Sequence, residues 1–119
     1  MLRAMIRFLV MYPAPTDPEA FDRHYYEVHL PLARQLPGLR SYNVSRNPPA
    51  PIRGEGAFHL VTELEYDDMD TLRNNFASPL GQQLAQDVDH LAELCPGIQS
   101  MVYELETLHG DMPVSSSTA

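Results

Sequence analysis

The sequence predicts an α+β fold in which one four-stranded antiparallel sheet carries all its helices on a single face. Three observations support this: four strand-like runs, stretches with apolar residues at helical spacing, and proline–glycine pairs that separate them. The resulting order, β-α-β-β-α-β, is that of the ferredoxin-like split βαβ arrangement. A chain of 119 residues suits one such domain, which we place at residues 1–109. Residues 110–119 are predicted to be a disordered tail.

The predicted strands differ in how many of their faces are apolar. Residues 5–12 are almost continuously apolar, as in a strand that is covered on both faces. Residues 39–46 and 58–66 alternate polar and apolar side chains, and residues 98–108 supply the fourth strand. The helices cover one face of the sheet only. A second copy of the chain, related by twofold symmetry, is therefore the simplest cover for the other face.

The first helix is predicted over residues 18–36, with either Thr16 or Asp17 as its N-cap. Its predicted buried stripe consists of Phe21, Tyr25, Val28 and Leu32. Pro31 removes one helical hydrogen bond, so a kink or break is expected beside His29. A short helix over residues 67–77 and a longer one, capped by Ser78, make up the second helical layer.

Two histidines occupy the first helix. His29 lies at the edge of the apolar stripe, where a kink would allow it to turn into a cavity; the alternative is a boundary histidine bonded to backbone. His24 precedes it by five residues, which in a regular α-helix places the two side chains about 140° apart. They are therefore not expected to form the i, i+4 pair of a helical metal site. No other cluster has ligand spacing, so no metal is predicted.

The composition excludes several classes of protein. A net charge of −8 argues against nucleic acid or an anionic membrane as a partner. The single cysteine, Cys95, forms no disulfide framework and is predicted to be a buried, inert thiol. The apolar N-terminal run is too short to span a membrane and lacks a small-residue cleavage site, so we expect a cytoplasmic protein, with Met5 as an alternative start.

Residues 5–13 (MIRFLVMYP) and 21–44 (FDRHYYEVHLPLARQLPGLRSYNV), with the aromatic third strand, resemble the EthD family of dimeric α/β-barrel proteins. The resemblance covers roughly residues 5–108. It implies a homodimer whose sheets pack face to face, with a small-molecule cavity between sheet and helices in each subunit. The family and its relatives include ether-degradation proteins, an isomerase, polyketide cyclases and cofactor-free monooxygenases.

The resemblance also implies roles for individual residues. In isomerase-like relatives a histidine of the first helix and a tyrosine of the second strand line the pocket, and VHLPLARQLPGLRSY places His29 and Tyr42 at those positions. His24 is implied near the pocket as well. Tyr25 either lines the same wall or belongs to the core, and His59 faces either the pocket or the dimer interface.

These residues suggest an enzyme that needs no cofactor. It would be an isomerase, lyase, cyclase or monooxygenase-like protein acting on a small aromatic, quinone or lactone in catabolism. His29 would act as acid and base, while Tyr42 would polarise a carbonyl or hold an enolate oxygen. The alternative is a non-catalytic protein that binds a small ligand or assists an oxygenase of a degradation pathway. Haem chemistry is not expected, because haem-degrading relatives use a pocket tryptophan and the chain contains none.

Overall fold

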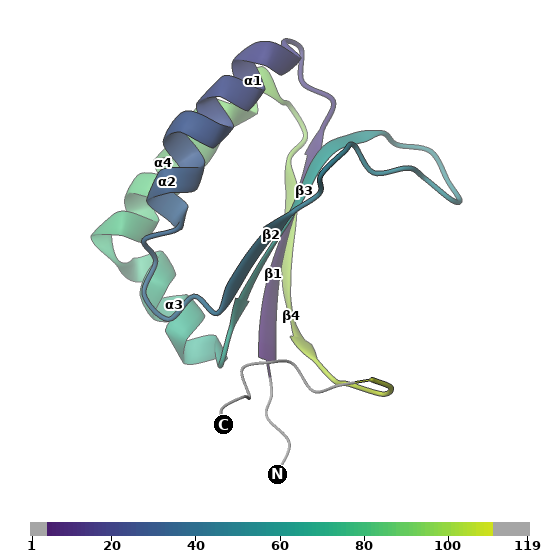
Figure 1. Ribbon diagram of the computed structural model, residues 1–119. Helices are drawn as coiled ribbons and strands as arrows, with labels where there is room; N and C mark the ends of the chain where they lie inside the picture. Colours follow the sequence, from purple (N-terminus) through teal and green to yellow (C-terminus); the bar gives the residue numbers. More distant parts are fainter. Residues whose placement is uncertain (1–4, 111–119) are drawn as a thin grey trace.

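The computed structural model describes residues 5–110 (Figure 1), so the predicted tail beyond Gly110 lies outside the described residues. Its four strands form one antiparallel sheet in the order β2-β3-β1-β4. The helices all lie on one side of this sheet (Figure 1), which confirms the predicted ferredoxin-like α+β fold. The elements are β1 (Met5–Pro13), α1 (Pro18–His24), η1 (Tyr25–His29), α2 (Leu30–Ala33), β2 (Ser41–Val44), β3 (Phe58–Tyr66), α3 (Met69–Ala77), α4 (Pro79–Leu94) and β4 (Gln99–Leu105).

The two faces of the sheet carry different side chains. The covered face contributes core residues from the two central strands: Ile6, Val10, Tyr12, Leu60, Thr62, Leu64 and Tyr66. On the opposite face, Leu9 of β1 lies between Glu63 of β3 and Met101 of β4. Beside them Arg7 donates a hydrogen bond to Glu65 at 2.9 Å. This open face is a mixture of apolar side chains and paired charges.

The first helical segment runs without interruption from α1 through η1 to α2. It begins at Asp17, whose carboxylate accepts a hydrogen bond from the backbone of Ala20, so Asp17 is the N-cap. The segment η1 is a π-helical turn, in which the N–H of Leu30 donates to the carbonyl of Tyr25, five residues earlier. The turn ends just before Pro31, where the sequence predicted a kink or break. The helix ends at Ala33, three residues earlier than predicted.

The π-turn changes which side chains face the core. A π-turn contains one more residue than an α-turn, so every residue after it is rotated around the helix axis. Val28, predicted to be buried, is 41% exposed, and His29 takes the inward position with 6% exposure. The inward residues are therefore Phe21, Tyr25, His29, Ala33 and Leu36. The prediction of Val28 in the buried stripe is wrong, because it assumed regular α-helical spacing throughout.

The second helical region consists of the regular α-helices α3 and α4. Asp68 caps α3 and Ser78 caps α4, each through a side-chain oxygen that accepts a backbone N–H of the first turn. Leu84 and Leu91, on the predicted apolar stripe of α4, are buried. The loop between β2 and β3 extends away from the helical layer (Figure 1) and is mostly exposed.

Candidate functional site

A cavity of about 390 Å³ lies between the helices and the covered face of the sheet. This volume falls in the range of small-molecule binding sites. Most of its lining is apolar, from Phe8 and Val10 of β1 to Leu84 and Val88 of α4. The buried or half-buried polar side chains that reach it are Tyr12, Tyr25, His29, Tyr42 and Thr62.

The charged side chains of the cavity lining are few. Among the lining residues within 5–110, none is a lysine or an arginine. The one carboxylate in this described lining is that of Asp89, which is exposed, as is Ser100. Burying an anion without a cationic partner costs free energy, so the cavity is suited to an uncharged ligand.

His29 is held by a carboxylate of the facing helix. Its Nδ1 lies 2.8 Å from Oδ2 of Asp87 in α4, and its ring stacks on that of Tyr25 with centroids 5.2 Å apart. An ionised carboxylate can only accept, so Nδ1 carries the proton and Nε2 is left as a free acceptor. Burial lowers the pKa of His29, while the hydrogen bond to Asp87 opposes this effect in part. The neutral imidazole is therefore the favoured form near pH 7.

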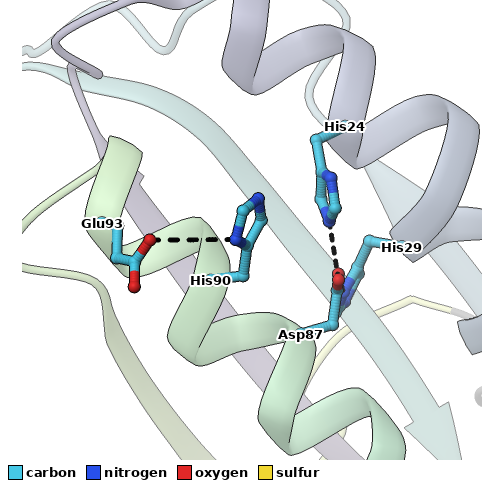
Figure 2. Close-up of polar contacts among 5 residues, drawn as sticks. All are labelled: His24, His29, Asp87, His90 and Glu93. Carbon is cyan, nitrogen blue, oxygen red and sulfur yellow. Dashed lines mark hydrogen bonds and ion pairs between the residues drawn. The ribbon is translucent and has the colours of Figure 1, made fainter.

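His24 binds the second oxygen of the same carboxylate. Its Nε2 lies 2.6 Å from Oδ1 of Asp87, and Figure 2 shows the imidazoles of His24 and His29 converging on this one side chain. The expected angle of about 140° between His24 and His29 is wrong, because it assumed regular α-helical spacing throughout. A π-turn joins residues five apart, so the two histidines lie on one side of the helix.

A pair of tyrosines supplies the second polar element of the cavity. The hydroxyls of Tyr25 and Tyr42 lie 2.6 Å apart, so one donates to the other and a single O–H remains free to donate. Burial raises the pKa of both phenols, and they stay protonated at neutral pH. Tyr12 packs edge-on against Tyr25 with ring centroids 5.6 Å apart and also lines the cavity.

The structure separates the five predicted site residues into two groups. Tyr25, His29 and Tyr42 line the cavity. His24 does not line it and contacts the site through Asp87. His59 lies away from the cavity and hydrogen-bonds Asp22 of α1 at 2.7 Å.

Sequence reasoning missed Asp87, although the sequence contains a signal for it. Asp87 lies three residues after Leu84 and four before Leu91, which places a carboxylate on the predicted buried stripe of α4. A buried charge requires a partner, so this position predicts a polar contact with the facing helix. Tyr12 was missed too, because it was assigned only to an apolar strand.

Neither a metal site nor a membrane helix is found in the part of the chain that is described. Within residues 5–110, no three or more histidine, cysteine, aspartate or glutamate side chains are grouped so that they could hold a metal ion. No helix in the same range is long and apolar enough to cross a bilayer.

Comparison with known proteins assigns the family. Residues 13–94 match the EthD domain, and the chain belongs to this family. It is 30% identical over 110 residues to an uncharacterized 11.0 kDa protein encoded between thcB and thcC in Rhodococcus erythropolis, covering 87% of this chain and 98% of that protein. The crystal structure of an EthD family protein from Bacillus halodurans is 33% identical, with a TM-score of 0.74 over 86% of this chain and 99% of the other.

More distant structures share the fold. Hydroxynitrile lyase from Passiflora edulis is 15% identical, with a TM-score of 0.69 over 89% of this chain and 97% of the lyase. The cofactor-independent oxygenase SnoaB from Streptomyces nogalater is 17% identical, with a TM-score of 0.61 over 87% and 96% of the two chains. A dimeric ferredoxin-like protein from Thermobifida fusca is 12% identical, with a TM-score of 0.64 over 87% and 92%. At these identities the likeness concerns the fold alone.

Proposed function

We propose that the protein is a cofactor-independent enzyme that moves a proton on a small, uncharged aromatic, quinone or lactone in a catabolic reaction. The observation that carries the proposal is that a carboxylate-held imidazole and a hydrogen-bonded tyrosine pair line one apolar cavity. An imidazole that is neutral near pH 7 is an effective general base. A phenol O–H is a suitable donor to an oxygen on which negative charge develops.

The proposed reaction begins with Nε2 of His29 taking a proton from a carbon next to a carbonyl group. The C–H electron pair becomes the C=C bond of an enolate. The enolate oxygen accepts a hydrogen bond from the free O–H of the Tyr25–Tyr42 pair. Return of the proton from His29 to a different carbon completes an isomerisation. In a lyase reaction the enolate instead re-forms the carbonyl, its C=C electron pair becomes a double bond to the neighbouring carbon, and the leaving group departs with its bonding pair and takes the proton from His29. Asp87 is a positioning residue, because it fixes the tautomer that leaves Nε2 free.

Among the residues that the structure describes, no lysine or arginine lines the cavity, and this narrows the class of ligand. A substrate carboxylate or phosphate would be buried without a counter-charge, whereas a ketone, quinone, phenol or lactone needs only the hydroxyl donors. The distant structural relatives include a lyase and a cofactor-independent oxygenase, so this scaffold accommodates such reactions elsewhere.

The proposal is tested by proton exchange in D2O. The protein is incubated with a panel of uncharged carbonyl compounds, such as β-tetralone, an unsaturated γ-lactone and a methylated naphthoquinone, and loss of the acidic C–H signal is followed by proton NMR. We expect catalysed exchange for at least one compound, and a loss of about 10²–10⁴-fold in His29→Gln. His109→Gln, an exposed histidine outside the cavity, is the matched control. Equal rates in wild type and His29→Gln contradict the proposal.

A non-catalytic ligand-binding or accessory role is the second candidate. The mostly apolar lining of the cavity favours it, because such a cavity binds a small ligand whether or not chemistry follows. The same variant separates the two functions. A binding protein retains its affinity for β-naphthol in His29→Gln and catalyses no exchange, while the enzyme loses exchange in that variant.

We further propose that a second copy of the chain covers the open face of the sheet. Met101 and Tyr103 of β4 are 46% and 37% exposed on this face, beside Leu9. Exposed apolar side chains on a sheet are typical of a buried interface, and the related protein from Thermobifida fusca is dimeric. We expect a dimer by analytical ultracentrifugation and a monomer after Met101→Glu. Ile52→Glu, in the loop between β2 and β3, is the control, because Ile52 is 98% exposed away from the sheet. A monomeric wild type contradicts this assignment.

A further inference from the structure

The bond between His24 and Asp87 has no function in the reaction described above. His24 does not line the cavity, yet it binds the carboxylate that orients His29, at 2.6 Å. Its side chain is 21% exposed, compared with 12% for Asp87 and 8% for His29. Figure 2 shows the carboxylate of Asp87 between the two rings. The three side chains therefore form a series from the cavity outwards, with His24 nearest to solvent.

This inference depends on the proposed role of His29. We propose that His24 is a positioning residue. Of the group formed by His24, Asp87 and His29, it is His24 that binds an additional proton first, so that Nε2 of His29 stays free to accept a proton from the ligand.

One additional proton can be held by either of the two histidines that bind Asp87. Asp87 supplies a single negative charge to two imidazoles, so it stabilises one imidazolium well and a second one poorly. A charge on His24 is partly solvated by water, whereas a charge on His29 lies in the buried wall of the cavity. A cation on His24 also repels a second cation on His29. Both effects direct the proton to His24 and keep His29 neutral.

The titratable groups packed around His24 and His29 come from α4 and from the cavity side. On α4, the ring of His90 lies 4.5 Å from that of His24, and its Nδ1 lies 3.8 Å from Glu93. On the cavity side, Tyr12 of β1 and Tyr42 of β2 remain neutral near pH 7, because burial raises the pKa of both. Tyr25, stacked on His29, remains neutral for the same reason. Of these neighbours only His90 ordinarily changes charge near neutral pH, so it needs a control of its own.

The test uses the full chain without any ligand, so it does not depend on finding a substrate. Ring nitrogens of ¹⁵N-labelled protein are followed by long-range ¹H–¹⁵N NMR as the pH is lowered. We expect His29 at pH 7 in the neutral form with its proton on Nδ1, and we expect His24 to become protonated before His29. His24→Gln retains an amide donor for Asp87 but cannot carry charge. In that variant the titration midpoint of His29 is expected to move to higher pH, and by more than in His90→Gln.

Several results would overturn the inference. Protonation of His29 before His24 in the wild type does so without any variant, and so does a neutral His29 with its proton on Nε2. In folded His24→Gln, an unchanged or lowered midpoint for His29 has the same consequence. Absence of proton exchange with every panel compound would count against the proposed function alone, because the NMR titration measures the histidines directly.

Discussion

The two helical segments that cover the sheet differ in their helical spacing. In α4 the apolar residues recur at α-helical spacing, and Leu84 and Leu91 are buried where that spacing places them. In the first helical segment the π-turn η1 shifts the spacing by one residue, which exposes Val28 and buries His29. The regular helix contributes apolar lining such as Leu84 and Val88, and the irregular one contributes His29. A change of helical period can thus turn a polar side chain towards the core.

The irregular turn ends two residues before Pro31. Proline has no N–H to donate to the carbonyl four residues earlier, which here is that of Glu27. In η1 the hydrogen bonding passes to pairs five residues apart, as between Leu30 and Tyr25. Turns of this kind are common at functional sites, which supports the proposed role of His29.

Truncation of one apolar residue in each of the two helical segments should change stability most, and by different amounts. The sequence pattern alone assigns Leu91 and Val28 to buried stripes. The structure leaves Leu91 with 0% exposure and Val28 with 41%. We expect Leu91→Ala to lower the free energy of unfolding by about 2–5 kcal/mol. Val28→Ala should change it by no more than about 0.5 kcal/mol.

Urea denaturation of both variants at one protein concentration measures this contrast. Similar losses in the two variants would mean that the first helix follows regular spacing after all, and that the π-turn is absent in solution.

Replacement of Asp87, which joins α4 to the first helical segment, is expected to have the next largest effect on stability. Asp87→Asn removes the charge that both histidines share and places an amide N–H where an acceptor is needed. Loss of hydrogen bonds to a charged group costs about 1.5–3 kcal/mol, so we expect a loss of this size in urea denaturation. Asp89→Asn is the matched control, because Asp89 lies on the same helix and is exposed. Equal effects of the two substitutions would show that Asp87 does not hold the first helix in place.

The pH dependence of stability gives the smallest effect. Burial lowers the pKa of folded His29, so just below pH 6.5, its value in an unfolded chain, the unfolded state binds more protons. The free energy of unfolding should therefore fall as the pH is lowered through about 6.5, and level off once folded His29 becomes protonated. The difference between wild type and His29→Gln, measured from pH 8 to 5, isolates this contribution. A wild type that gains stability relative to His29→Gln on acidification would reverse the assigned direction.

Most of the fold could be predicted from the sequence, because it depends on patterns that are local. The order of elements, the third strand at Phe58–Tyr66 and the helix after Ser78 all have the predicted positions. The resemblance to a known family also indicated His29 and Tyr42, and both line the cavity. The hydrogen bond between His29 and Asp87 could not be predicted from local patterns or from the resemblance. It joins residues 58 positions apart and depends on a helical period that no local pattern reveals.

The proposal that His29 acts as a base on an uncharged ligand in the cavity is best tested by a crystal structure of the protein soaked with β-naphthol, an uncharged bicyclic phenol. We expect the ring system in the cavity, its oxygen within hydrogen-bonding distance of Tyr25 or Tyr42, and Nε2 of His29 facing the ligand while Nδ1 keeps its bond to Asp87. A cavity closed by side chains, or a His29 ring turned to solvent and away from Asp87, would contradict the assignment of His29 as the base.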